Sequence, residues 1–250
     1  MKLEGKCALI TGGTKGIGAA IAVDLAQQGA DIAINARNED NTVAEVRGQI
    51  EAAGRRCAFI QADMASPDEV EACVRRAADA LGGLDILIHN AGGSCFGKIE
   101  EITPDDWNYT FAVHVNAAYH LCRHALPILR RNSEGVIILV SSVAGLRGCP
   151  GAIAYGTAKG AILQFTRMLA RDLADDNIRV NCVAPGVIRT RFHEKMTLEQ
   201  KAHNLAVRIP LHREGTPYDV AEAVRLLVTS EFMTGETIVV DGGTSMQVVR

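Results

Sequence analysis

The fold is decided by one stretch near the start of the chain, Cys7-Ala8-Leu9-Ile10-Thr11-Gly12-Gly13-Thr14-Lys15-Gly16-Ile17-Gly18. An apolar run of strand length passes into a glycine-rich turn, and a helical pattern follows at once. Glycine lets the backbone adopt positive φ and approach a phosphate, while a helix start presents free N–H groups and the positive end of its dipole. The stretch therefore predicts a strand, a turn and a helix with a phosphate site at the turn, although a plain structural turn explains a lone glycine motif about equally well.

Apolar runs and helical patterns alternate along the rest of the chain. The runs of strand length lie at residues 7–10, 32–34, 57–60, 84–88, 136–140, 178–183 and 237–240. The helical patterns lie at residues 16–28, 39–53, 67–81, 104–131, 153–174 and 217–228. Nearly continuous hydrophobic strands are typical of a parallel sheet covered by helices on both faces. We therefore expect an α/β fold, a doubly wound, Rossmann-like sheet of seven parallel strands, in a single domain over residues 1–250.

The composition excludes several classes of function. A net charge of -3 and 4% aromatic residues argue against a nucleic-acid surface, which needs a basic stripe or stacking platforms. The seven cysteines include no C-x-x-C pair, so neither a zinc site nor a disulfide framework is indicated. The longest aliphatic run, residues 136–140, is too short to span a bilayer. We expect a cytoplasmic protein with no metal, nucleic-acid or membrane partner.

The end of the second predicted strand favours one dinucleotide over another. A dinucleotide fold that selects NAD places an acidic residue there, against the ribose 2′-hydroxyl. This chain has Asn35-Ala36-Arg37 instead. Arg37 and Lys15 could together bind a 2′-phosphate, which indicates NADP(H) rather than NAD(H). The alternative is that both are solvated basic side chains.

Tyr155 and Lys159 form the strongest candidate for catalysis. They lie four residues apart at the start of a predicted helix, so their side chains share one face. A neighbouring ammonium favours the phenolate, and Lys159 is therefore expected to lower the pKa of Tyr155 toward neutrality for general acid–base catalysis. Ser142 follows a predicted strand, 13 residues before Tyr155, at the sheet edge where ligands bind. Alone, a Y-x-x-x-K pair is common on exposed helices.

The motifs taken together resemble the short-chain dehydrogenase/reductase family. The resemblance rests on T-G-x-x-x-G-x-G, Asn90-Ala91-Gly92, Asn116, Ser142, Tyr155-x-x-x-Lys159 and Pro185-Gly186, in this order over almost the whole chain. It implies that Tyr155 exchanges a proton with the substrate oxygen and that Ser142 holds this oxygen. It also implies that Lys159 supports Tyr155 and that Asn116 positions a relay water.

The resemblance further implies a set of residues that bind the cofactor, for which NADP(H) is favoured over NAD(H). This set is Gly12, Thr14, Lys15, Gly16, Ile17, Gly18, Arg37, Asp63, Met64, Asn90, Ala91, Gly92, Tyr155, Lys159, Pro185, Gly186, Ile188 and Thr190. His89 stands where the family more often has a second asparagine, and we expect no catalytic role for it.

The substrate is not specified by any motif. Residues 191–216 lack strong periodicity and are expected to form a substrate lid loop, with Phe192, Met196 and Leu205 closing over the site. The favoured function is an NADP(H)-dependent interconversion of a ketone and a secondary alcohol on a small molecule, such as a 3-oxoacyl or sugar-like compound, by a homotetramer. An NAD-dependent alcohol or sugar dehydrogenase and a non-catalytic nucleotide sensor stay open as alternatives.

Overall fold

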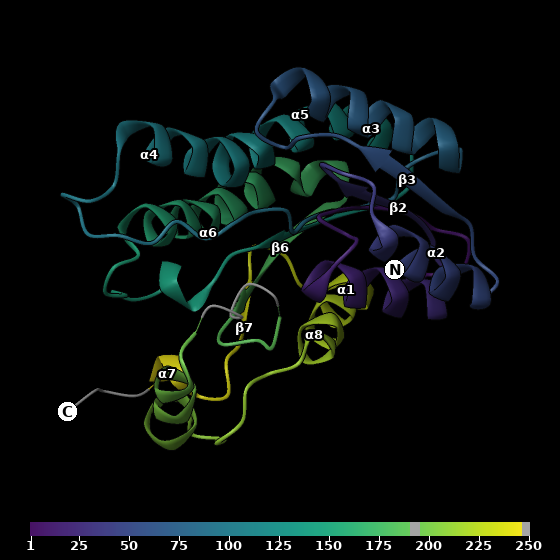
Figure 1. Ribbon diagram of the computed structural model, residues 1–250. Helices are drawn as coiled ribbons and strands as arrows, with labels where there is room; N and C mark the ends of the chain where they lie inside the picture. The colour runs from purple at the N-terminus through teal and green to yellow at the C-terminus, as the bar shows by residue number, and fades with distance from the viewer. Residues whose placement is uncertain (191–195, 247–250) are drawn as a thin grey trace.

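Parallel strands form the centre of the computed structural model, which describes residues 1–190 and 196–246. Within these residues the strands pair in the order β3-β2-β1-β4-β5-β6-β7 (Figure 1). They are β1 (Cys7–Thr11), β2 (Asp31–Ala36), β3 (Cys57–Gln61), β4 (Ile86–His89), β5 (Gly135–Val140), β6 (Ile178–Pro185) and β7 (Thr237–Val240). The order runs outward from β1 to β3 and then returns to β4 on the other side of β1. The predicted doubly wound parallel sheet is confirmed, and its crevice lies at the carboxyl ends of β1 and β4.

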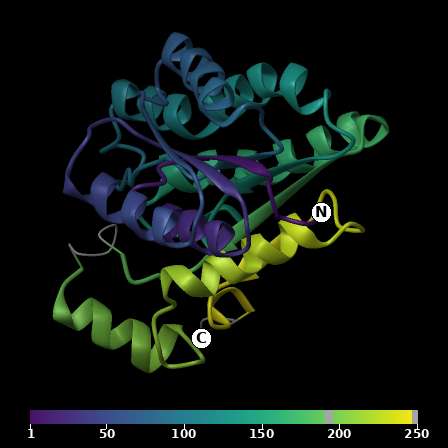
Figure 2. The same cartoon turned by 90° about the vertical axis from the view of Figure 1, so that its right-hand side faces the viewer.

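Helices cover both faces of the sheet (Figures 1 and 2). The helices are α1 (Gly16–Gln27), α2 (Asn41–Ala52), α3 (Pro67–Leu81), α4 (Pro104–Phe111), α5 (Ala117–Leu129), α6 (Ile153–Leu173), α7 (Leu198–His203) and α8 (Pro217–Thr229). Strand β1 shows why two layers form, because Leu9 packs into the core beneath α3, α5 and α6, whereas Ala8 and Ile10 pack into the core beneath α1, α2 and α8. Alternate residues of a strand point to opposite faces, so a wholly apolar strand needs cover on both.

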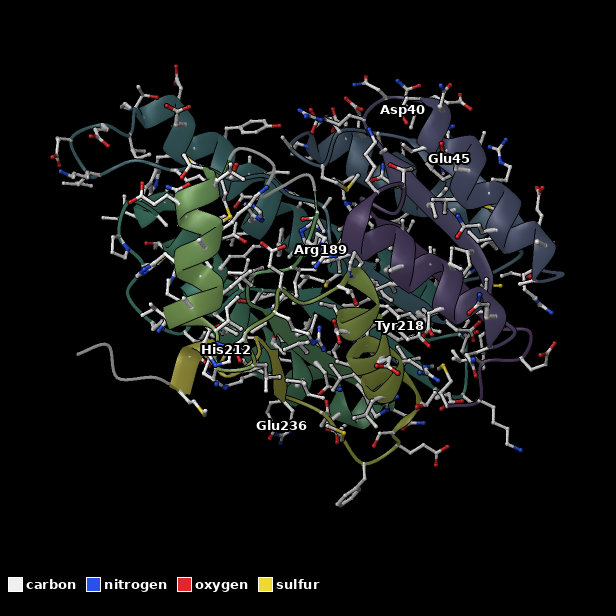
Figure 3. All side chains as sticks on the ribbon, turned by 60° about the horizontal axis from the view of Figure 1, so that its bottom comes forward. Asp40, Glu45, Arg189, His212, Tyr218 and Glu236 are labelled. Atoms are coloured by element: carbon white, nitrogen blue, oxygen red, sulfur yellow. The ribbon has the colours of Figure 1, made fainter. Side chains whose placement is uncertain are left out.

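Two segments differ from the sequence prediction. The predicted helix over residues 104–131 is interrupted by a π-helical turn at Ala112–Asn116, between α4 and α5. The stretch predicted as a structureless lid contains α7 and a second π-helical turn at Asn204–Arg208. Thr197 begins α7 with a capping box to Gln200, a signal in the sequence that the prediction missed. Helix α7 stands apart from the two helical layers (Figure 1). The next helix, α8, begins near Tyr218, which is labelled in Figure 3. Phe192 lies outside the described residues.

The helices of the described ranges give no sign of a membrane span. None of them combines the length and the apolar composition needed to cross a bilayer.

Candidate active site

The glycine turn after β1 is shaped by contacts that exclude side chains. Gly12 and Gly16 have φ of 62° and 54°, in the left-handed region that favours glycine. A Cβ atom on Gly18 would lie 2.2 Å from the Gly12 carbonyl oxygen, so Gly18 allows α1 to pack against the turn. Lys15, at the N-cap of α1, makes no side-chain capping bond. The first N–H groups of α1 are therefore available to an anion.

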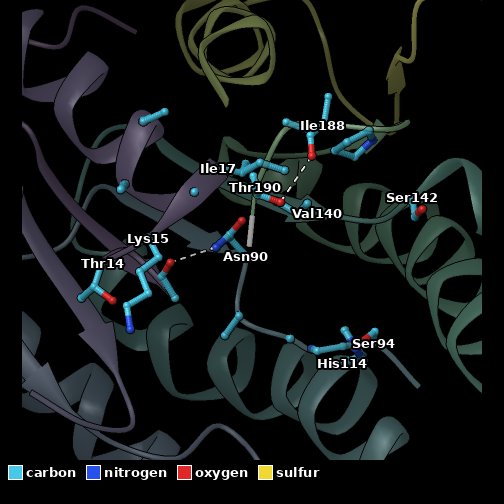
Figure 4. A pocket seen from close by; sticks show the side chains of 18 of the residues that line it. Thr14, Lys15, Ile17, Asn90, Ser94, His114, Val140, Ser142, Ile188 and Thr190 are labelled. Carbon is cyan, nitrogen blue, oxygen red and sulfur yellow. Dashed lines mark hydrogen bonds between the residues drawn. The ribbon is translucent and has the colours of Figure 1, made fainter. Parts of the chain in front are cut away.

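A cavity of about 1940 Å³ extends from this turn across the carboxyl ends of the strands (Figure 4). It brings together nearly all of the predicted site residues. Its walls include Gly12, Thr14, Lys15, Gly16, Ile17, Arg37, Asp63, Met64, Asn90, Ala91, Gly92, Ser142, Tyr155, Lys159, Pro185, Gly186, Ile188 and Thr190. Gly18 and Asn116 are not among the lining residues. Gly18 instead has the packing role described above.

The loop after β4 is fastened to the glycine turn by a polar network. Thr11 Oγ1 accepts hydrogen bonds from the backbone N–H groups of Asn90 (3.1 Å) and Ala91 (3.0 Å). Asn90 Nδ2 donates to the carbonyl oxygens of Thr11 and Gly12, each at 3.1 Å. These bonds hold Asn90-Ala91-Gly92 beside the turn. The two motifs therefore form one wall although they lie far apart in the sequence.

Tyr155 and Ser142 meet because glycines allow α6 to pack against the turn after β5. A Cβ atom on Gly145 would lie 2.6 Å from the Lys159 carbonyl carbon, and one on Gly156 would lie 2.9 Å from the Ala144 oxygen. The resulting close approach places the Ser142 hydroxyl in a hydrogen bond with Tyr155. Ser142 Oγ also accepts a bond from the Ala144 N–H at 3.2 Å. The serine hydroxyl is thereby fixed at the strand end.

Lys159 is almost fully buried, with 5% of its surface exposed. Its Nζ donates to the Val140 carbonyl oxygen at 2.8 Å and lies 5.7 Å from the centre of the Tyr155 ring. Burial lowers the pKa of Lys159 to about 8. Burial also raises the pKa of Tyr155 to about 12, against a smaller lowering by the Ser142 hydrogen bond. The predicted lowering of the Tyr155 pKa is therefore wrong for this structure, because desolvation of the buried phenol is the dominant cause and raises the pKa.

The prediction for Asn116 also needs correction. The π-helical turn at Ala112–Asn116 changes which side chains face the sheet, and it leaves Asn116 exposed to solvent and outside the cavity. His114, two residues earlier, is 2% exposed and lines the cavity instead (Figure 4). Its ring lies edge-on to the Tyr155 ring, with 5.6 Å between the ring centres. The polar group that this helix contributes to the site is thus an imidazole.

The opposite end of the cavity is more exposed and carries charged residues. Arg37 Nη1 donates to the Tyr109 hydroxyl at 2.9 Å, which links the end of β2 to α4. Lys15 Nζ forms an ion pair with Asp40, and this pair and the Thr42 hydrogen bonds lower the pKa of Asp40 to about 2. Asp40, seen at the surface beside α2 in Figure 3, was missed as a site residue. Its place three residues after Arg37, just before α2, was the available signal.

The remaining predicted residues complete the wall. Asp63 Oδ1 accepts a hydrogen bond from the Ala65 N–H at 2.9 Å, and Met64 is buried beside it. Thr190 Oγ1 donates to the Ile188 carbonyl oxygen at 3.3 Å. A Cβ atom on Gly16 would lie 3.1 Å from Thr190 Cγ2, so the segment after β6 returns to the glycine turn. Of the predicted lid residues, Met196 lines the cavity and Leu205 does not.

The described residues hold no cluster of histidine, cysteine, aspartate and glutamate suited to a metal ion. The polar groups gathered at the catalytic end of the cavity are a phenol, a hydroxyl, an ammonium and an imidazole, and the uncapped start of α1 lies in the same cavity. Such a set can move a proton at a substrate oxygen while a bound nucleotide lies along the strand ends.

Comparison with known proteins finds relatives and solved structures that are similar to this chain over nearly its whole length. Residues 12–245 match a family model described as enoyl-(acyl carrier protein) reductase. The chain is 38% identical to versicolorin reductase stcU of Emericella nidulans, over 97% of this chain and 96% of that protein. It is 36% identical to dehydrogenase/reductase SDR family member 4 of Homo sapiens, over 97% of this chain and 88% of that protein. A solved short chain dehydrogenase from Burkholderia cenocepacia, in complex with NADP, has a TM-score of 0.91 and 38% identity, and the match covers 98% of this chain and 99% of that one.

Proposed function

The chain belongs to the short-chain dehydrogenase/reductase family and is a dehydrogenase/reductase acting on CH–OH groups with NAD(P), and we propose that it interconverts a ketone and a secondary alcohol using NADP(H). The observation that carries this proposal is the shared cavity, in which Tyr155, hydrogen-bonded to Ser142, stands beside the buried Lys159. An anion-binding turn lies in the same cavity, and the matched Burkholderia enzyme was solved with NADP.

The residues at the turn fit a dinucleotide with a 2′-phosphate. The uncapped start of α1 and the left-handed Gly12 and Gly16 form a cradle for the pyrophosphate. Arg37 and Lys15 would hold the 2′-phosphate, since no acidic residue stands at the end of β2. The Asn90-Ala91-Gly92 segment and the Ile188 to Thr190 segment would contact the adenine ribose and the nicotinamide.

In the proposed mechanism NADPH, when bound, supplies the hydride. The Tyr155 hydroxyl donates its proton to the substrate oxygen, and its raised pKa keeps the proton in place until a developing alkoxide draws it away. Ser142 donates a hydrogen bond to the same oxygen and so stabilises its negative charge. Lys159 stabilises the tyrosinate that forms and returns a proton to it. Oxidation of an alcohol uses the same groups in reverse.

The test compares the wild-type enzyme with Tyr155→Phe. We expect wild-type enzyme to oxidise NADPH with at least one ketone from a panel of 3-oxoacyl thioesters, keto sugars and diketones. We expect Tyr155→Phe to bind NADPH with unchanged affinity, by fluorescence titration, and to lose turnover. A variant that turns over like the wild type contradicts the role of Tyr155. Parallel assays with NADH separate the NAD-dependent alternative, and an enzyme inert toward the whole panel favours the nucleotide sensor.

We also propose a homotetramer in a reducing, cytoplasmic setting. The assembly is supported by apolar side chains exposed on α5 and α6, Tyr119 at 48% and Met168 at 57%. The reducing setting is supported by the seven free cysteines. Light scattering of the purified protein tests the assembly, and a monomer contradicts it.

A further inference from the structure

Arg208 is a half-buried arginine that lines the catalytic cavity. Its Nη1 donates a hydrogen bond of 3.0 Å to Asn204 Oδ1. A guanidinium carries five N–H donors and a permanent positive charge, and it commonly binds a carboxylate through two parallel hydrogen bonds. Within residues 1–190 and 196–246, the other donors of Arg208 have no partner and no carboxylate forms an ion pair with it. The side chain therefore has both donors and charge available to an anion in the cavity.

The bond to Asn204 fixes where the guanidinium lies. Asn204 is 1% exposed and begins the π-helical turn at Asn204–Arg208, so its amide is held inside the protein. Its carbonyl oxygen accepts a hydrogen bond from the Ile209 N–H at 2.8 Å, and its Nδ2 lies 4.0 Å from Met196 Sδ. A neutral amide orients the guanidinium without neutralising it, whereas a carboxylate in its place would form an ion pair. The fold thus holds Arg208 in position and leaves its charge uncompensated.

The order of the strands places Arg208 on the catalytic half of the cavity. The Leu211 N–H donates to the Gly242 carbonyl oxygen at 3.2 Å, so the segment that follows the π-helical turn packs beside the loop after β7. Ser142 follows β5, on the same side of the sheet order as β7, whereas Arg37 follows β2 on the other side of β1. Arg208 therefore shares a half of the cavity with the groups that would bind the substrate oxygen, and not with the proposed 2′-phosphate site.

The carboxylates of the cavity are confined to the opposite half. Those among its described lining residues are Asp24, Asp40, Glu45 and Asp63, which lie on α1, on α2 or after β2 and β3. The described lining residues at the ends of β4 to β7 and on α7 include no carboxylate, and they include Lys159 and Arg208. Positive side chains without counter-charges in a cleft raise the local concentration of anions. The catalytic half therefore favours a substrate with a negative charge.

The same half of the cavity has an apolar wall. Phe96, Val143, Pro150 and Met196 line it. The ring of Phe96 lies 6.4 Å, centre to centre, from the ring of Tyr155, so this wall reaches the catalytic hydroxyl. Apolar side chains beside the reacting group favour a substrate with a hydrocarbon body, because its contact with them removes apolar surface from water.

We propose that the substrate is an oxo acid, a ketone on an apolar chain that carries a carboxylate, and that Arg208 binds this carboxylate. The inference rests on the proposed ketone reduction and names its substrate class. The ketone oxygen lies at Tyr155 and Ser142, the chain lies along Phe96, and the guanidinium donates two hydrogen bonds to the carboxylate. Hydride from NADPH and the proton of Tyr155 convert the ketone to a secondary alcohol, and the carboxylate leaves unchanged in a hydroxy acid. Arg208 is a specificity-determining residue and takes no part in the transfer of hydride or proton.

Matched acids and esters test the proposal on the unmodified enzyme. The substrates are straight-chain oxo acids of increasing length, each beside its methyl ester, which keeps the ketone and the chain but has no charge. At the best chain length we expect kcat/KM to be about 10- to 100-fold higher for the acid, the range for a hydrogen bond to a charged group, with most of the difference in KM. Esters that match or exceed their acids at every chain length overturn the proposal.

Substitutions of Arg208 separate its charge from its place in the structure. Arg208→Gln keeps a donor for Asn204 and removes the charge, whereas Arg208→Lys keeps the charge without the planar fork. We expect the Gln variant to lose the preference for acids with kcat/KM for the esters unchanged, and the Lys variant to recover part of the preference. Lys201→Gln, a loss of the same charge on α7 outside the cavity lining, is the matched control. A Gln variant that keeps the preference, or that loses acid and ester activity equally, overturns the proposal.

A binding measurement separates this proposal from the proposed reaction. An alkanoate of the best chain length has the carboxylate but no ketone to reduce. Calorimetric titration into enzyme saturated with NADPH should give a Kd that rises about 10- to 100-fold in Arg208→Gln, while the Kd for NADPH stays the same. A raised Kd for NADPH instead shows that Arg208 binds the cofactor and overturns the proposal. Alkanoate binding through Arg208 in an enzyme that reduces no ketone contradicts the proposed function alone, whereas ketone reduction without a preference for acids contradicts this inference alone.

Discussion

The two ends of the cavity differ in how far their charged and polar side chains are exposed to solvent. At the catalytic end Lys159 and His114 are 5% and 2% exposed, and burial is the main cause of their shifted pKa values. At the other end the side chains of Lys15 and Asp40 are 42% and 44% exposed, and the pKa of Asp40 is lowered by hydrogen bonds and a neighbouring charge. Desolvation is insensitive to salt, whereas exposed charge pairs are screened by it. Salt should therefore affect the charges at the exposed end of the cavity more than those at the buried end, and the predictions below use this difference to test the two ends separately.

The largest effect is expected from removing the buried charge. Lys159→Met should lower kcat for ketone reduction by about 10²- to 10⁴-fold, because proton transfer loses its supporting group. The same variant should melt at the same temperature as the wild type or higher, since a buried ammonium with few partners is destabilising. Steady-state kinetics and thermal melting check both parts. A large drop in melting temperature shows that Lys159 is mainly structural.

The next largest effect is expected from a substitution at the exposed end of the cavity. Arg37→Glu should raise the Kd for NADPH by about 10- to 100-fold, the range for a lost hydrogen bond to a charged group. The Kd for NADH should stay the same or fall, because an acid at this place can bind the ribose 2′-hydroxyl. Arg75→Glu, an equal change of charge on the exposed face of α3, is the control. An unchanged Kd for NADPH in the Arg37 variant contradicts the assignment of a 2′-phosphate site.

Local spacing was enough to predict the fold and much of the site. The strand, turn and helix at Thr11 to Gly18 and the four-residue spacing of Tyr155 and Lys159 depend on contacts within one or two elements. Relations between residues so close in the sequence can be predicted from their spacing alone. The alternation of apolar strands and helical patterns likewise predicted a parallel sheet with a layer of helices on each face.

Features that depend on distant partners could not be predicted in this way. The π-helical turn contacts a residue that is distant in the sequence, since His89 on β4 bonds to the His114 carbonyl oxygen, and Asn116 at the end of this turn does not line the cavity. The raised pKa of Tyr155 depends on how far the surrounding elements remove its hydroxyl from water. Spacing in the sequence reveals neither the helix interruption nor the desolvation, so the prediction placed Asn116 in the cavity, which it does not line, and expected the Tyr155 pKa to be lowered rather than raised.

Stability should depend on pH through the two buried histidines. Burial lowers the pKa of His89 to about 3 and that of His114 to about 2, below the value near 6.5 of an unfolded histidine. Below pH 6.5 the unfolded chain takes up protons that the folded chain cannot. Stability is thus complete above about pH 6.5 and falls as pH drops toward 3, by about 1.4 kcal/mol per pH unit for each histidine.

Urea unfolding between pH 7.5 and 5 measures this slope. His89→Gln keeps a donor for the His114 carbonyl and should flatten the dependence, whereas His120→Gln on α5 should leave it unchanged. A His89→Gln slope equal to that of the wild type shows that other groups control the acid sensitivity of the fold.

The smallest effect is expected from Asp40, which forms an ion pair with Lys15, a proposed ligand of the 2′-phosphate. Asp40→Asn retains an oxygen to accept the hydrogen bond from the Thr42 N–H, so the cap of α2 survives while the ion pair with Lys15 is lost. The freed Lys15 should lower the Kd for NADPH by about two- to fivefold, the range for one exposed pair. The gain should shrink at high salt. Titrations at two ionic strengths check this, with Asp40→Ala, which also removes the cap, as the comparison. A Kd that rises in Asp40→Asn means that Asp40 orients Lys15 for the phosphate rather than competing with it.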